Sequence, residues 1–135
     1  MKLTTKSEYA CLALLYMSEN YEKGMMKTEE IASRWKIPRK YLEQILLFLN
    51  KAGYVRSKRG IDGGYGLAKH PRQITVAEII RLMDGPLAPV GSVSKYYYQN
   101  TPIEQSRALV SLMTDIRNYI SRTLERTTFA DLLKG

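Results

Sequence analysis

Apolar residues recur every three or four positions in the first part of the chain, which is the period of one face of an α-helix. These positions are Tyr9, Leu12, Ala13 and Tyr16. Thr5 and Glu8 stand just before and among them in the order of a capping box, in which each side chain bonds the other residue's backbone N–H. The pattern predicts a helix that has Thr5 as its cap and ends near Gly24.

Two shorter apolar groups follow, separated by a turn, and their spacing predicts a helix-turn-helix. The inward-facing positions are Ile31, Trp35, Ile37, Leu42, Ile45, Leu46 and Leu49. Thr28 is the expected cap of the first helix, and the small Ala32 stands where the two helices must touch. Lys36 occupies the turn position that glycine often fills, and Pro38 disfavours a helical conformation in the residue before it. The second helix is expected from about residue 39 to residue 51.

Residues 53–68 predict a β-hairpin. A strand signal at Tyr54 and Val55 leads to a glycine-rich tip at residues 60–64, and the chain returns through residues 65–68. A hairpin directly after a helix-turn-helix is the wing of a winged helix, and its glycines allow the backbone to approach a phosphate or enter a minor groove. A nucleotide phosphate-binding loop is the alternative, but this segment lacks the Gly-Lys-Ser/Thr ending and a helix directly after it.

The segment after the hairpin predicts a helix that begins at a capping box formed by Thr75 and Glu78. Its inward-facing positions are Val76, Ile79, Ile80 and Met83. Gly85 and Pro86 end it. Residues 1–85 are therefore predicted to form a mainly α winged helix-turn-helix DNA-binding domain with a two-stranded wing.

A long helix is predicted near the C-terminus, from a third capping box at Thr101 and Glu104 to about Arg126. About 25 residues at about 1.5 Å each span about 37 Å, which is longer than a domain of this size is wide. Its apolar stripe would be exposed in a single chain, and pairing with a second copy removes that surface from water. Residues 102–135 are thus predicted to be a dimerisation helix with a C-terminal cap, and residues 86–101 a sensor or linker loop. The expected dimer contacts are Leu109, Leu112, Met113, Ile116, Tyr119, Ile120 and Thr123.

The net charge of +8 is confined to one part of the chain. Ten basic and two acidic residues lie between Arg34 and Arg72, whereas basic and acidic residues balance elsewhere. A solvated face without a partner would spread the surplus along the chain, while binding to a polyanion concentrates it. Charge and motif together indicate double-stranded DNA as the partner.

Catalysis, export and membrane insertion are not indicated by the sequence. Cys11 is the single cysteine and His70 the single histidine, so neither an internal disulfide nor a pair of nucleophile and histidine base is indicated. No apolar run approaches the roughly 20 residues that span a bilayer, and the first residues lack a signal peptide's apolar block. We therefore expect a cytoplasmic protein that is not an enzyme, in which Cys11 is a small buried residue.

Several segments resemble the Rrf family of winged-helix transcription regulators, which includes regulators of iron–sulfur, nitric-oxide and cysteine metabolism. The matching segments are residues 1–6 (MKLTTK), 41–44 (YLEQ), 51–53 (KAG), 55–57 (VRS), 59–60 (RG), 63–65 (GGY), 85–90 (GPLAPV) and 127–133 (TTFADLL). They occur in the same order over nearly the whole chain, and chance does not account for such agreement.

The resemblance implies a homodimer on a partly palindromic DNA site, with residues 39–51 in the major groove. Lys40, Tyr41 and Gln44 match the positions that contact base edges, and Arg59 with Gly60 would enter the minor groove. The full set of expected DNA contacts is Lys2, Thr5, Lys6, Thr28, Lys40, Tyr41, Gln44, Arg56, Lys58, Arg59, Gly60, Gly63 and Gly64.

Family members that bind an iron–sulfur cluster carry three cysteines in the loop after Gly85, and this chain has none there. Hydroxyl groups stand near those positions, and they are poor ligands for such a cluster. We expect a repressor that needs no cluster, metal or other cofactor. The possible sensor residues are Ser92, Tyr96, Tyr97, Tyr98 and Ser106. A docked metabolic enzyme, a small-molecule effector and a metal or redox signal at this loop stay open as alternatives.

Overall fold

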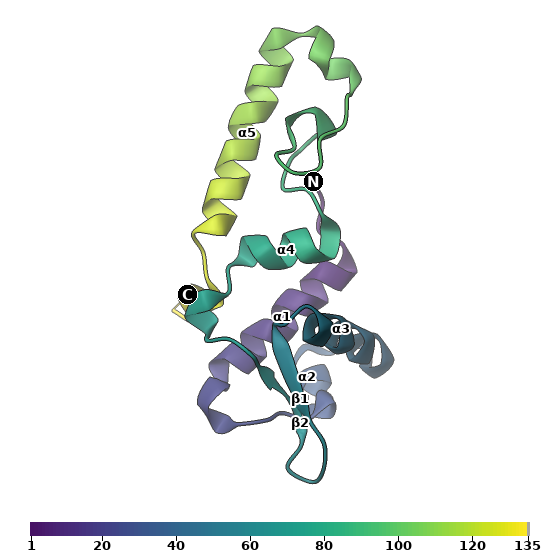
Figure 1. Cartoon of the computed structure of the whole chain (residues 1–135), viewed down its shortest axis with the longest axis vertical. Helices are drawn as coiled ribbons and strands as arrows, with labels where there is room; N and C mark the ends of the chain where they lie inside the picture. The colour runs from purple at the N-terminus through teal and green to yellow at the C-terminus, as the bar shows by residue number, and fades with distance from the viewer. Residues whose placement is uncertain (135) are drawn as a thin grey trace.

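Helices make up most of the chain, and a β-hairpin lies near its middle (Figure 1). The structure is a computed structural model and describes residues 1–134. The helices are α1 (Thr5–Glu19), α2 (Thr28–Trp35), α3 (Arg39–Lys51), α4 (Val76–Asp84), α5 (Arg107–Glu125) and α6 (Phe129–Leu132). The strands are β1 (Val55–Lys58) and β2 (Gly64–Leu67). Short 3₁₀ turns are η1 (Tyr21–Lys23), η2 (Pro71–Gln73), η3 (Gly91–Val93) and η4 (Pro102–Gln105).

Helix α1 lies at the centre of the main core. Ala10, Ala13 and Leu14 are fully buried, and elements from both halves of the sequence pack around this helix. The predicted core of the helix-turn-helix is confirmed, because Ile31, Ile37 and the apolar stripe of α3 are all buried. Trp35 is only partly buried, and the Arg34 guanidinium lies 4.0 Å from the centre of its ring. The sequence pattern therefore gave the buried face of this motif correctly.

The cap of α1 is Thr4 rather than Thr5, so the predicted capping box of Thr5 and Glu8 is wrong. The Thr4 hydroxyl accepts a hydrogen bond from the Ser7 N–H at 3.2 Å. Thr4 also donates its own N–H (3.1 Å) and its hydroxyl to the carboxylate of Asp84, at the end of α4. This long-range anchor fixes where the helix begins, and no local sequence pattern contains it.

The other end of α1 also differs from the prediction. The helix ends at Glu19, and Asn20 closes it by donating its side-chain N–H to the Tyr16 carbonyl at 2.9 Å. The chain then passes through η1 before it reaches Gly24, whose φ is +85°. The glycine thus ends the turn that follows the helix rather than the helix itself.

Lys27 stands at the N-cap position of α2 without a capping bond from its side chain, and Thr28 is the first helical residue, which corrects the predicted cap. The Lys27 N–H bonds the Glu30 carboxylate at 3.3 Å. At the other end Lys36 has φ +56°, the left-handed conformation of the turn position that glycine often fills. The Ile37 N–H donates to the Ala32 carbonyl at 3.0 Å. A left-handed non-glycine residue costs about 1–2 kcal/mol, which the packed core of the motif offsets.

The wing is an antiparallel hairpin in which Val55 lies opposite Leu67 and Lys58 opposite Gly64. One contact was not predicted. Met26 pairs with Tyr65 through two backbone hydrogen bonds of 2.8 Å, so the segment before α2 lies along the outer edge of β2. The wing is therefore tied to the helix-turn-helix from both sides.

Helix α5 begins at Arg107, not at Pro102 as the sequence predicted. The predicted capping box at Thr101 and Glu104 exists, but it caps the short turn η4. The chain then bends, and a new helix, α5, starts after Ser106, whose hydroxyl accepts from the Leu109 N–H at 3.3 Å. The 19 residues of α5 span about 28 Å at about 1.5 Å per residue, which is shorter than predicted.

The C-terminal segment returns to the main core. Phe129 is 1% exposed, its N–H donates to the Ile74 carbonyl at 3.0 Å, and Val76 donates to the Thr127 carbonyl at 2.9 Å. The predicted segments 1–85 and 102–135 therefore share one core; Gly135 lies outside the described residues. Figure 1 shows the wing and the far end of α5 at opposite ends of the molecule.

Candidate nucleic-acid interface

The exposed face of α3 carries the side chains predicted to contact bases. Lys40, Tyr41 and Gln44 are exposed, while the neighbouring Leu42 and Ile45 are buried in the core. Because the core grips one side of the helix, the opposite side has a fixed direction. An α-helix presented in this way has the dimensions of the DNA major groove.

The first turn of α1 lies beside this face. Lys6, Tyr41, Gln44 and Phe48 line one hollow of about 240 Å³, and the Lys6 ammonium lies 5.9 Å from the centre of the Phe48 ring. Tyr9 packs edge-on against Tyr41, with ring centres 5.5 Å apart. The structure thus brings a predicted phosphate contact, Lys6, beside two predicted base contacts that lie 35 and 38 residues later in the sequence. Lys2 and Thr5 are also exposed near this end of α1.

The tip of the wing carries a second basic group. Lys58 and Arg59 are exposed, and among residues 1–134 neither forms an ion pair. Lys27 had no place in the sequence prediction, but its ammonium donates to the Gly60 carbonyl at 3.3 Å and to the Ile61 carbonyl at 2.8 Å. Because these partners are 33 and 34 residues away, sequence patterns gave no sign of this brace.

The three wing glycines predicted to contact DNA have different surroundings. A Cβ atom on Gly63 would lie 2.2 Å from the Lys58 carbonyl oxygen, and one on Gly64 would lie 2.2 Å from the Met26 carbonyl oxygen. Both are therefore needed for close packing inside the wing, and Gly63 is buried. Gly60 is exposed, and an added Cβ atom would meet nothing within 4 Å, so it alone of the three leaves open space on its outer side.

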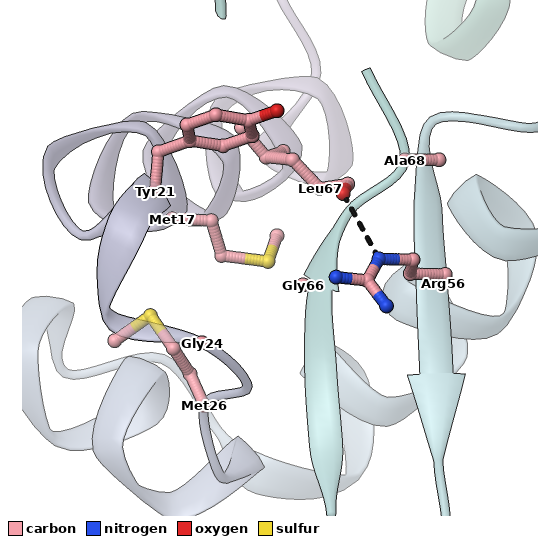
Figure 2. Close-up of a pocket in the computed structure, with 8 residues that line it drawn as sticks. All are labelled: Met17, Tyr21, Gly24, Met26, Arg56, Gly66, Leu67 and Ala68. Carbon is pink, nitrogen blue, oxygen red and sulfur yellow. Dashed lines mark hydrogen bonds between the residues drawn. The ribbon is translucent and has the colours of Figure 1, made fainter. Parts of the chain in front are cut away.

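Arg56 faces away from α3. Ser57, its neighbour in β1, is bonded to Asn50 of α3 at 3.3 Å, and successive side chains of a strand point to opposite faces. Figure 2 shows Arg56 reaching over a hollow of about 310 Å³ beside Met17 and Tyr21, with its Nε donating to the Leu67 carbonyl at 3.4 Å. The structure therefore does not bring Arg56 to the face formed by Lys40, Tyr41 and Gln44.

Thr28 and Arg39 lie where α2 meets α3. Thr28 is half-buried in the first turn of α2. The Arg39 guanidinium bonds the Glu29 carboxylate at 2.7 Å and the Glu43 carboxylate at 3.1 Å, which ties the two helices together at the surface. Since its charge is already paired, Arg39 adds less to the attraction for DNA than Lys6, Lys58 or Arg59, which form no ion pair within residues 1–134.

The loop after α4 is organised by hydroxyl groups. The Ser92 Oγ accepts from the Thr101 N–H at 2.9 Å and donates to the Glu104 carboxylate at 2.9 Å. Glu104 also accepts from the Tyr98 hydroxyl at 2.8 Å, a bond that lowers the pKa of Glu104 and raises that of Tyr98. Ser106 caps α5. The hydroxyl groups near the family's cysteine positions thus form hydrogen bonds that hold the loop and the start of α5.

This donor set does not fit an iron–sulfur cluster, which needs soft thiolate ligands. Among the described residues 1–134, no group of three or more His, Cys, Asp or Glu side chains is placed to hold a metal ion. Burial, with a smaller contribution from Asp84, raises the pKa of the Cys11 thiol to about 11, so this thiol stays protonated at neutral pH. Cys11 is only half-buried against the main core, less than predicted, and its raised pKa does not favour a reactive thiol.

The chain matches the Rrf2 family, described as an iron-dependent transcriptional regulator, over residues 3–135. The chain belongs to the Rrf2 family. It is 43% identical over 100 residues to the rrf2-like helix-turn-helix regulator of Rhodobacter capsulatus, covering 72% of this chain and 67% of that protein. It is 32% identical over 132 residues to the regulator CymR of Bacillus subtilis, covering 98% and 89%.

Solved structures of the Rrf2 family share the fold. That of CymR, the global cysteine regulator of B. subtilis, superposes with a TM-score of 0.81 at 30% identity and covers 99% of this chain and 97% of its own. The regulator IscR of T. potens has a TM-score of 0.77 at 31% identity, covering 99% and 87%. These comparisons confirm the predicted family, winged-helix fold and role in transcription regulation, and the similar proteins are regulators rather than enzymes. Among residues 1–134, no helix has the length and apolar character to cross a membrane.

Proposed function

We propose that this Rrf2-family protein is a homodimeric repressor that inserts α3 into the major groove of a partly palindromic operator. The observation that carries the proposal is the convergence of Lys6 with Tyr41 and Gln44 on one exposed face. A phosphate contact there fixes how deeply the helix enters the groove, and the two neighbouring side chains then meet base edges. A bound dimer excludes other proteins from the DNA that it covers, which is how it represses. Its place of action is the bacterial cytoplasm, where the DNA lies.

Two alanine variants test this assignment. Gln44→Ala is expected to cost about 1–3 kcal/mol on the operator and to relax base preference at one position in each half-site, because glutamine pairs with adenine by two hydrogen bonds. Lys6→Ala is expected to weaken binding to operator and random duplexes alike and to reduce the slope of log affinity against log salt by about one per contacted phosphate. Fluorescence anisotropy titrations on both duplexes at several salt concentrations measure each effect. Equal losses of Gln44→Ala on both duplexes would remove α3 from the role of recognition helix.

The dimer proposal rests on the exposed stripe of α5. Leu109, Leu112, Ile116 and Tyr119 are 44%, 51%, 38% and 70% exposed, although three of them are aliphatic. Met113 and Thr123 lie partly buried beside this stripe. Ile120 packs with Leu124 against the cluster of Ala77, Ile80 and Leu87, so part of its surface is already used within the chain. A second copy of α5 covers the remaining stripe.

We further propose that operator binding is independent of an iron–sulfur cluster, because Ser92, Tyr98 and Ser106 already serve the hydrogen bonding of the loop and of α5. The protein purified without oxygen is expected to be colourless and to bind its operator equally well with and without an iron chelator. Absorption spectra after anaerobic reconstitution, paired with operator titrations, measure both. A visible charge-transfer band whose loss changes operator affinity would overturn this proposal.

The signal is proposed to act on the loop of residues 87–100, which contacts both functional parts. The Arg81 guanidinium of α4 lies 5.0 Å from the Tyr96 ring centre and bonds Glu125 of α5 at 2.6 Å. Helix α4 in turn holds Thr4 through Asp84, next to the DNA-binding face. Tyr96, Tyr97 and Tyr98 are all exposed, which favours a docked enzyme or small-molecule effector over a metal or redox signal.

A further inference from the structure

Ile61 is the most exposed of the large apolar side chains in the described part of the chain, at 93%. It lies at the turn between β1 and β2, and no apolar cluster of residues 1–134 includes it. A single exposed apolar residue is common and needs no explanation by itself. Its position at the free end of a basic hairpin, separated from Lys58 and Arg59 only by Gly60, does call for an explanation.

The backbone that carries Ile61 is held in place. Lys27 bonds the carbonyls of Gly60 and Ile61, and the Gly63 N–H closes the turn on the Gly60 carbonyl at 3.0 Å. The contacts of Gly63 and Gly64 leave no space for a side chain, so this part of the wing is packed to van der Waals distance. Ile61 therefore projects from a braced tip, and its branched side chain has few rotamers to lose on binding.

The charges around the tip favour DNA as the partner of this side chain. Arg59 lies two residues before it. The hollow beside Ile61 is lined by four basic residues, Lys23, Lys27, Arg56 and Lys58, which outnumber the acidic Glu30 and Asp62. A cationic tip that ends in an apolar group matches proteins that insert a side chain between base steps through the minor groove and bend the duplex. A protein partner would not need this excess of positive charge at the tip.

We propose that Ile61 is a wedge that enters the minor groove beside Arg59, partly unstacks one base step and bends the operator. This rests on the proposed function, in which the wing meets DNA. Pyrimidine–purine steps such as TA unstack most easily, so the wedge selects a flexible step at a fixed distance from the bases read by α3. Specificity at that step then comes from DNA deformability, without a hydrogen bond to a base.

The test uses the full-length protein and an operator selected by it from random duplex DNA, made with either TA or GG at the step under the wing. The native protein is expected to prefer the TA operator by about tenfold and to bend it. Ile61→Ser is expected to lose this preference and most of the bend, measured by energy transfer between the duplex ends, with an unchanged salt slope. Ile61→Val keeps all three properties, and Arg59→Ala lowers the salt slope by about one.

Each outcome decides one question. The side chain is almost fully exposed, so Ile61→Ser folds normally, which circular dichroism checks. Should Ile61→Ser match the native protein in affinity, step preference and bend, the wedge is overturned while the proposed function stands. If the native protein selects no duplex from the random pool, the proposed function itself fails.

Discussion

Replacing Leu112 by glutamate is expected to convert the protein from dimer to monomer. Leu112 is 51% exposed in the single chain, so a carboxylate there is hydrated and leaves the monomer folded. In the proposed interface it becomes an unpaired buried charge, which costs about 3–5 kcal/mol, and the symmetry places it there twice. The dimer dissociation constant should rise by at least about a thousandfold, and operator affinity should fall because the two half-sites no longer act together.

Ser111→Glu is the matched control for this variant. It adds the same carboxylate one residue earlier on α5, about 100° around the helix from Leu112, at another exposed position. Light scattering at micromolar concentration should report a dimer for Ser111→Glu and a monomer for Leu112→Glu. A Leu112→Glu protein that remains dimeric would place the interface on another surface.

Gly64→Ala is expected to lower the free energy of unfolding by about 3–4 kcal/mol, because it combines backbone strain with overpacking. Gly64 has φ +136°, and its added Cβ would lie 2.2 Å from the Met26 carbonyl oxygen. That oxygen accepts the Tyr65 N–H at 2.8 Å, so moving it away also breaks the pairing that ties the wing to the segment before α2. Urea denaturation at one fixed protein concentration measures the loss.

Gly60→Ala separates the strain from the steric clash. Gly60 has φ +104° in the same hairpin, but nothing lies within 4 Å of its added Cβ. Its substitution should cost about 1–2 kcal/mol, the contribution of the backbone conformation alone. Equal losses for the two variants would mean that Met26 moves away easily and that the edge of β2 is not held as the structure indicates.

The features that sequence predicted best are those that neighbouring residues determine. The bounds of α3 followed from Pro38 and the spacing of its apolar residues, and the box of Thr75 and Glu78 caps α4 through bonds of 2.7 and 3.2 Å. The box of Thr101 and Glu104 was also real, but it caps only one turn. A capping box marks where a helix can begin and does not by itself show how far that helix continues.

The missed features depend on residues far apart in sequence. Asp84 decides that Thr4 caps α1, and Met26 pairs with Tyr65, yet neither contact leaves a periodic signal. The same holds for the DNA-binding face. The exposed positions of α3 follow from periodicity, whereas the direction of Arg56 and the brace from Lys27 depend on how the wing packs.

The burial of Phe129 among residues of α1 and α4 has a consequence for how the protein is made. The ribosome releases α1, the helix-turn-helix and the wing long before Phe129, so the nascent chain lacks one of the largest buried side chains of its core. Helix α5 must emerge before that side chain can close the core. The DNA-binding part and α5 therefore complete their folding together, and the DNA-binding part of an unfinished chain still lacks its closing core residue.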